Sequence, residues 1–169
     1  MLLYEDIITN DEMFSDAFPV KLIDDIAYEV DCTMIVVRPG ADVNIGANPS
    51  AEEQEEAMQE EGAQTVNNVV YSFRLQPTSF DKKTYLTCLK GYMKAVKAKL
   101  QQSNPERVEV FEKGASEYAK KIIANFKDYE FYTGESMNPD GMIALLNYRE
   151  DGTTPYFTFW KDGVKEIKL

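Results

Sequence analysis

The longest amphipathic segment of the chain covers residues 79–128 and has the sequence SFDKKTYLTCLKGYMKAVKAKLQQSNPERVEVFEKGASEYAKKIIANFKD. Apolar residues recur in it every three or four positions, which is typical of helices that bury one face. The first run comprises Tyr85, Leu89, Tyr92, Met93, Val96 and Leu100, and the second comprises Val108, Phe111, Ala115, Tyr118, Ala119, Ile122, Ile123 and Phe126. Only Gln101 to Asn104 separate the runs, and such a short connection predicts an antiparallel helical hairpin over 79–128.

Capping residues mark the start of both helices. We expect Thr78 or Ser79 to cap the first helix, with Asp81 in its first turn, where a carboxylate favours the helix dipole. In the second helix we expect Asn104 as the N-cap and Pro105 as the first helical residue.

Four lysines of the first helix form a second stripe, which lies about 120° from the apolar one: Lys83, Lys90, Lys94 and Lys97. Residues 79–128 carry a net charge of +5, whereas the whole chain carries −11. We therefore expect a basic hairpin on an acidic body, which disfavours nucleic-acid binding but suits an acidic protein partner. The plainer interpretation is that the lysine stripe is only solvated.

The segment 39–66 contains seven acidic residues and neither Lys nor Arg. It has too few large apolar residues to offset its ordering entropy, so we expect a flexible acidic loop. Ser50, which is followed by Ala51, Glu52 and Glu53, matches the preference of an acid-directed kinase and is a candidate phosphorylation site.

Strand patterns flank the loop and the hairpin. We expect a short strand at Leu2–Tyr4, a strand from Lys21 to Val30 and another over Met34–Val37, after a turn near residues 31–33. Alternating apolar residues between Val69 and Leu75 predict a further strand that leads into the hairpin.

Asp-Gly pairs recur every eleven residues after the hairpin, at Asp140-Gly141, Asp151-Gly152 and Asp162-Gly163. Because both residues tolerate positive φ, Asp-Gly between apolar runs indicates a type I′ turn. Residues 129–168 are therefore expected to form an antiparallel meander. We therefore expect one α+β domain over 1–169. It consists of a β-rich body, which includes this meander, and a helical hairpin.

The residue inventory disfavours an enzyme. The chain has no histidine, so the commonest general base and metal ligand is missing. Cys32 and Cys88 have no CxxC spacing and cannot supply a four-cysteine zinc site; we expect both to be small core or surface residues. No secretory signal or apolar run of about 20 residues is present, so we expect a reducing, cytoplasmic location without membrane contact.

Calcium is a possible ligand because hard cations bind oxygen and the chain is rich in carboxylates. Ser136-x-Asn138-x-Asp140-Gly141 resembles the start of an EF-hand loop, but it lacks the final glutamate, so a plain turn is the alternative. The acidic loop offers a second set of candidate ligands, namely Glu52, Glu53, Glu55 and Glu56. Any such site should be weak, because flexible ligands must be ordered on binding, and we expect no tightly bound cofactor.

Several long motifs resemble the translationally controlled tumour protein family. They are residues 10–16 (NDEMFSD), 45–52 (IGANPSAE), 105–108 (PERV), 126–148 (FKDYEFYTGESMNPDGMIALLNY) and 148–152 (YREDG), so the similarity extends over nearly the whole chain. The resemblance implies a body of twisted antiparallel sheets with a projecting helical hairpin, similar to the Mss4/Dss4 chaperones of nucleotide-free Rab GTPases. Some vertebrate members end in a dimer-forming cysteine, whereas this chain ends Ile167-Lys168-Leu169, so we expect a monomer.

The resemblance also implies cytoplasmic binding roles and a part in growth control. It suggests one enzyme, a methionine sulfoxide reductase of similar fold, which would need a cysteine nucleophile in a cleft; we expect a binding and regulatory protein instead. Expected ligands are calcium, tubulin and microtubules, small GTPases such as Rheb, and, as in some members, translation elongation factors and anti-apoptotic Bcl-2 proteins. The matching motif makes Asp11 and Glu12 the candidate GTPase contact, and the acidic tails of tubulin suit the lysine stripe. The alternative is a dedicated chaperone or exchange factor for a Rheb-like or Rab-like GTPase.

Overall fold

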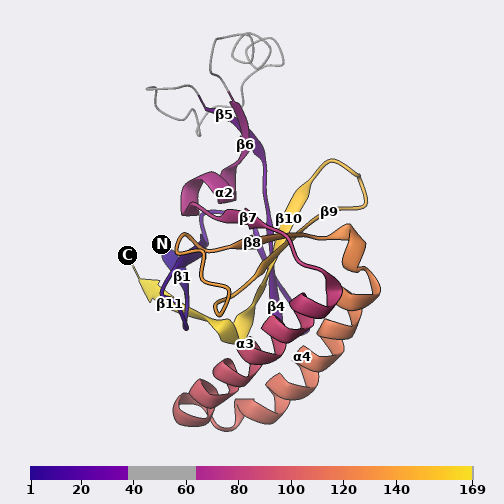
Figure 1. Ribbon diagram of the computed structural model, residues 1–169. Helices are drawn as coiled ribbons and strands as arrows, with labels where there is room; N and C mark the ends of the chain where they lie inside the picture. Colours follow the sequence, from indigo (N-terminus) through magenta and orange to yellow (C-terminus); the bar gives the residue numbers. More distant parts are fainter. Residues whose placement is uncertain (38–63, 169) are drawn as a thin grey trace.

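The described residues, 1–37 and 64–168, form antiparallel β-sheets and a long helical hairpin in the computed structural model (Figure 1). The largest described sheet has six strands in the order β3-β4-β10-β9-β8-β7. Their bounds are Val20–Ile23 (β3), Ala27–Asp31 (β4), Gln76–Thr78 (β7), Glu130–Thr133 (β8), Ala144–Tyr148 (β9) and Pro155–Trp160 (β10). The predicted α+β class is therefore confirmed. No helix in the described ranges is long and apolar enough to cross a membrane.

A second sheet joins the two ends of the described chain. Its order is β11-β1-β2, with β1 at Leu2–Asp6, β2 at Glu12–Ser15 and β11 at Val164–Lys168. The predicted meander is correct from β8 to β10 but wrong for its last strand, because β11 pairs with β1. Both edges of β10 are already occupied, by β9 and β4, and the 3-10 helix η2 (Lys161–Gly163) leads the chain away to the other sheet.

The predicted type I′ turns are also wrong. Among the described glycines only Gly152 has a positive φ, of 73°, and no Asp of the three Asp-Gly pairs has one. At the β9–β10 connection the carboxylate of Asp151 accepts hydrogen bonds from the amides of Thr153 and Thr154, at 2.8 and 2.9 Å. Such Asx geometry stabilises a wider loop, which closes where the amide of Arg149 donates to the carbonyl of Thr154.

The expected single strand from Lys21 to Val30 is two strands, β3 and β4, joined by a turn. Asp24 and Asp25 have φ values of 53° and 58°, and the amide of Ile26 donates to the carbonyl of Ile23 at 2.9 Å. Asp tolerates the left-handed region better than most residues, which explains a turn inside an otherwise strand-like sequence.

A two-stranded sheet, β5 (Met34–Val37) with β6 (Gln64–Asn67), borders the undescribed residues 38–63. Residues 64–66 were expected in the acidic loop, and that part of the prediction is wrong because they pair with β5. The rest of the expected loop, 39–63, lies outside the described residues.

The strand expected from Val69 to Leu75 is instead a helix, α2 (Asn68–Phe73). The side chain of Asn67 caps it by accepting from the amides of Val69 and Val70, and Arg74 ends it with a left-handed φ of 56°. Val69 and Phe73 are both buried, four residues apart on one helical face, so the apolar spacing fits a helix as well as a strand.

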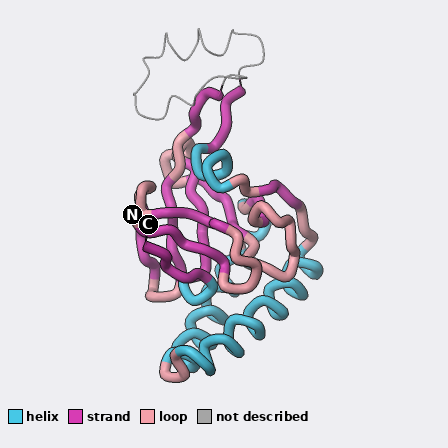
Figure 2. The backbone as a smooth tube through the Cα atoms, turned by 90° about the vertical axis from the view of Figure 1, so that its left-hand side faces the viewer, coloured by secondary structure: helices cyan, strands magenta, loops and turns pink. Residues whose placement is uncertain are grey.

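The predicted hairpin is confirmed as α3 (Lys82–Ser103) and α4 (Arg107–Ala124), followed by the 3-10 helix η1 (Phe126–Asp128). Figure 2 shows the two helices side by side below the sheets. Asp81, and not Thr78 or Ser79, caps α3: its Oδ1 lies 2.7 Å from the amide of Thr84. The helix cannot start earlier because residues 76–78 pair as β7 with β8.

The second helix also starts later than expected. Residues 104–106 form a turn in which the carbonyl of Asn104 accepts from the amide of Arg107 at 3.0 Å. Glu106 is therefore the N-cap residue of α4, and it makes no side-chain capping hydrogen bond.

The hairpin packs closely against the sheets. Ile26, from the β3–β4 turn, lies against Gly114 of α4, where an added Cβ would come within 2.4 Å of the isoleucine side chain. Tyr118 of α4 meets the ring of Trp160 edge to face at 5.6 Å. The core beneath is rich in aromatic rings, and Phe14 stacks between Tyr4 at 4.4 Å and Phe159 at 4.5 Å. Such rings contribute large buried apolar areas and specific geometry.

Candidate functional site

The two residues predicted to contact a GTPase lie where the β1–β2 turn meets β2, with Asp11 in the turn and Glu12 as the first residue of the strand. The backbone of the turn is closed by the amide of Asp6, which donates to the carbonyl of Asp11 at 2.9 Å, and Asn10 adopts a positive φ of 64°. Met13 and Phe14 follow with no exposed surface. Glu12 is exposed at the first position of β2, so its carboxylate stands at the edge of a rigid, buried strand.

Asp11 is held by the loop between β8 and β9. Its carboxylate accepts from the amide of Ser136 at 3.3 Å and from the hydroxyl of Ser136 at 2.5 Å. A Cβ at Gly134 would lie 2.4 Å from Oδ2 of Asp11, so this close approach requires glycine. The structure thus joins the predicted GTPase contact to the loop that contains the calcium candidates Asn138 and Asp140.

Those calcium candidates form a turn. The side-chain oxygen of Asn138 accepts from the amide of Asp140 at 2.9 Å, and both residues are exposed. Within residues 1–37 and 64–168 no group of three or more Asp, Glu, Cys or His residues is arranged to hold a metal ion. Ser50 and the four candidate glutamates, Glu52, Glu53, Glu55 and Glu56, lie outside the described residues.

The lysine stripe follows α3. Lys83, Lys90 and Lys94 are exposed, and none of them forms an ion pair with another described residue. Lys97 is only partly exposed and pairs with Glu112 of α4. Lys90, Lys94 and Lys97 border a groove of about 510 Å³ between the helices, whose floor includes Leu89 and Phe111.

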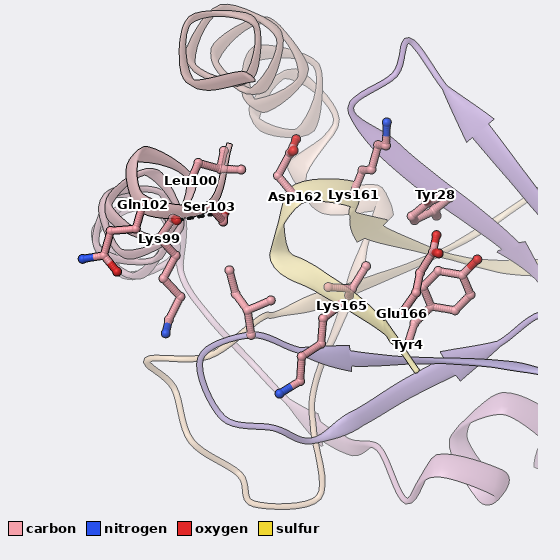
Figure 3. A pocket seen from close by; sticks show the side chains of 12 residues that line it. Tyr4, Tyr28, Lys99, Leu100, Gln102, Ser103, Lys161, Asp162, Lys165 and Glu166 are labelled. Atoms are coloured by element: carbon pink, nitrogen blue, oxygen red, sulfur yellow. Dashed lines mark hydrogen bonds between the residues drawn. The ribbon is translucent and has the colours of Figure 1, made fainter. Parts of the chain in front are cut away.

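A cavity of about 670 Å³ lies between the end of α3 and the β1–β11 sheet (Figure 3). Its wall includes Tyr4 and Tyr28, and burial raises the pKa of Tyr28 to about 12. Two of its three lysines already have partners: Lys161 pairs with Asp25 at 2.5 Å, and Lys165 donates to the side chain of Asn10 at 2.6 Å. We assign no ligand to this cleft, because its charges are mixed.

Neither cysteine is placed as a nucleophile. Cys32 is 1% exposed, and burial raises the pKa of its thiol to about 12, so it stays protonated at neutral pH. Cys88 is partly buried on α3. The structure therefore places Cys32 in the core and Cys88 at a partly exposed position, as expected for small core or surface residues.

Two residues that fix these surfaces in place were not predicted from the sequence. Asp6 is a buried carboxylate beneath the β1–β2 turn, and Arg107 ties α4 to Asp162 and Asp25. The one feature of the sequence that marks Asp6 is its place as an acidic residue at the end of an apolar strand. No pattern in the chain identifies the partners of Arg107, because they are 55 and 82 residues away.

Fold and surfaces together define a class of protein, an α+β fold of antiparallel sheets with a helical hairpin, whose candidate contacts are exposed charged side chains on rigid elements. The family model described as "Translationally controlled tumour protein" matches residues 1–165, and the chain belongs to this family, which is non-enzymatic.

Relatives and solved structures resemble the chain over its length. It is 67% identical over 169 residues to the "Translationally-controlled tumor protein homolog" of Yarrowia lipolytica and 66% identical to that of Schizosaccharomyces pombe, with 100% of both chains covered. The solved Schizosaccharomyces pombe protein p23fyp matches with a TM-score of 0.84 at 64% identity and full coverage of both chains. The Caenorhabditis elegans family member matches with a TM-score of 0.73 at 32% identity, covering 100% of this chain and 99% of that one.

Proposed function

We propose that this chain is a binding and regulatory protein that stabilises microtubules by docking the acidic tails of tubulin on α3. The observation that carries the proposal is the row of exposed lysines, Lys83, Lys90 and Lys94, on one face of a helix that is packed against the body. A rigid helix presents these charges at fixed spacing, which favours electrostatic capture of an acidic peptide. Lys97 contributes less, because Glu112 already neutralises it.

Co-sedimentation with microtubules tests this function. The triple variant Lys83→Glu, Lys90→Glu and Lys94→Glu should lose binding, and raising the salt concentration should weaken the wild type, since exposed charges are screened. The matched control reverses three exposed lysines elsewhere, Lys113, Lys120 and Lys127, and should still bind. Unchanged binding by the α3 variant, or equal loss in the control, would reject the lysine stripe as the site.

A small GTPase is the second partner that we propose, and the exposed carboxylate of Glu12 supports it. A carboxylate at this position competes for the basic and Mg²⁺-coordinating groups of a GTPase nucleotide pocket and so favours the empty state. Glu12→Val should weaken binding to the nucleotide-free GTPase, whereas Asp128→Asn, a charge loss on the exposed η1, should not. Wild-type affinity in Glu12→Val would remove this contact.

A nucleotide-release assay distinguishes a regulated partner from the alternative function, a dedicated chaperone or exchange factor. The alternative requires the protein to accelerate release of labelled GDP and requires Glu12→Val to abolish the acceleration. Binding without faster release supports the regulatory role.

We also propose weak calcium binding near the Asn138–Asp140 turn, whose exposed oxygens are hard ligands. An amide NMR titration with Ca²⁺ against Mg²⁺ at constant ionic strength tests it. Saturable shifts at residues 136–141 with Ca²⁺ alone would support a site there, whereas equal, linear shifts with both ions would mean screening only.

Binding of elongation factors, binding of Bcl-2 proteins, phosphorylation of Ser50 and a cytoplasmic location stay predictions.

A further inference from the structure

Asp6, the last residue of β1, is a carboxylate with only 1% of its surface exposed. Its Oδ1 accepts from the amide of Ile8 at 3.0 Å and from the hydroxyl of Tyr92 at 3.4 Å. Its Oδ2 accepts from the hydroxyl of Thr9 at 3.0 Å and from the amide of Met142 at 2.7 Å. A buried carboxylate is tolerated where such hydrogen bonds replace its hydration, so Asp6 is a fixed anchor beneath the β1–β2 turn.

The hydroxyl of Thr9 connects this anchor to the surface. It donates to Asp6 and at the same time accepts from the amide of Asp11, at 3.2 Å. The carboxylate of Asp11 in turn accepts from Ser136. We call this chain of contacts, from Asp6 through Thr9 and Asp11 to Ser136, the Thr9 relay. Because the hydroxyl has one proton to donate, its orientation is set by Asp6.

The methyl group of Thr9 is also fitted closely. A Cβ on Gly141 would lie 2.5 Å from Cγ2 of Thr9 and 2.7 Å from Oδ2 of Asp6. The site therefore uses both branches of the threonine side chain, the hydroxyl for the relay and the methyl for packing.

We propose that Thr9 is a positioning residue for the Glu12 surface. By holding the amide of Asp11, it fixes the direction in which the chain enters β2 and so the position from which the Glu12 side chain projects. Preorganisation of this kind lowers the ordering cost of binding. The proposal rests on the GTPase contact described above, but the positioning itself can be measured without a GTPase.

Two substitutions separate the branches of Thr9. Thr9→Val keeps the shape and removes the hydroxyl, so amide exchange of Asp11 should become about tenfold faster, as expected when one hydrogen bond to a polar network is lost. Affinity for the nucleotide-free GTPase should fall by about the same factor. Thr9→Ser keeps the hydroxyl, so it should retain most of the slow amide exchange of Asp11 and most of the affinity for the GTPase. Thr87→Val, which removes an exposed hydroxyl on α3, is the matched control and should change neither.

Microtubule co-sedimentation separates positioning from general unfolding. Thr9→Val should retain it, since the lysines of α3 are untouched. If Thr9→Val does not fold, Ser136→Ala removes the exposed outer end of the relay and should still loosen Asp11, measured as faster averaging of its side-chain NMR signals.

Each outcome decides one claim. If the amide of Asp11 exchanges at the same rate in Thr9→Val as in the wild type, the positioning role is overturned. This holds even if the variant loses affinity for the GTPase. Faster exchange in Thr9→Val, combined with no GTPase binding by the wild type, upholds the relay and rejects the proposed GTPase function.

Discussion

The guanidinium of Arg107 holds the carboxylate of Asp162 in a two-point contact, in which Nε lies 2.9 Å from Oδ1 and Nη2 lies 2.9 Å from Oδ2. The same guanidinium reaches Asp25 of the β3–β4 turn, where Nη1 lies 2.5 Å from Oδ2. The side chains of Arg107 and Asp162 are only 13% and 7% exposed. One residue at the start of α4 therefore holds the hairpin against both the β3–β4 turn and η2.

Removing this contact should destabilise the protein. Arg107→Ala leaves the buried Asp162 without its counter-charge, and we expect the free energy of unfolding to fall by about 3 kcal/mol. Lys121→Ala is the control, because Lys121 and Asp24 are about two-thirds exposed and 3.7 Å apart, and such a pair contributes less than about 1 kcal/mol. Urea unfolding at neutral pH measures both values. If both variants lower the free energy of unfolding by the same amount, the buried contact of Arg107 contributes no more to stability than an exposed ion pair.

Two helix glycines should respond in opposite ways to alanine. Gly91 of α3 has no atom within 4 Å of an added Cβ, so Gly91→Ala should stabilise the protein by about 0.5–1 kcal/mol through helix propensity. At Gly114 the same Cβ would come within 2.4 Å of Ile26, and the strain of about 1–3 kcal/mol should exceed that gain. Thermal unfolding should rank Gly91→Ala above the wild type and Gly114→Ala below it; the reverse order would contradict the packing of Ile26.

Asp151 should make the β9–β10 loop sensitive to acid. Hydrogen bonds from the side chain and backbone of Thr154 lower the pKa of Asp151 to about 2, from about 3.9 in an unfolded chain. A lowered pKa stabilises the folded state above pH 4, and this contribution is lost as the pH falls from about 4 to about 2. Carboxyl NMR should show the low midpoint, and Thr154→Val should raise it. An unshifted midpoint in the wild type would contradict the Asx geometry.

The two thiols should differ in reactivity. Cys32 is buried and its Sγ lies 3.5 Å from the carbonyl of Val30, whereas Cys88 is partly exposed. A thiol-specific reagent at mildly alkaline pH should modify Cys88 in the folded protein and Cys32 only after unfolding. Cys88→Ser should then show almost no reaction until denaturant is added. Rapid modification of folded Cys88→Ser would show that Cys32 is accessible.

Much of the fold could be predicted from periodicity alone. The hairpin has two long apolar stripes, and a pattern of that length has few alternatives. The segment from Val69 to Leu75 was predicted wrongly because a short run fits period two and a four-residue spacing equally well. The segment forms a helix and not a strand because Asn67 caps its start and Arg74 ends it in a left-handed conformation.

The candidate site could be predicted only in part. Asp11 and Glu12 were identified through a motif resemblance, and their contact with a GTPase stays a prediction. The relay below them was not predicted, because the contact between Asp11 and Ser136 joins residues 125 positions apart and leaves no local signal. Long-range partners of this kind are set by tertiary packing, which one sequence does not reveal.

The pairing of β1 with β11 has a consequence for synthesis on the ribosome. Leu2 faces Lys168 in the register of these strands, so the sheet that supports the Glu12 turn needs residues from both ends of the described chain (Figure 1). A two-stranded β1–β2 unit alone would be marginally stable in water. The α3–α4 hairpin, by contrast, can form from neighbouring residues as soon as they emerge. The lysine face can thus form before the sheet behind the Glu12 face is complete.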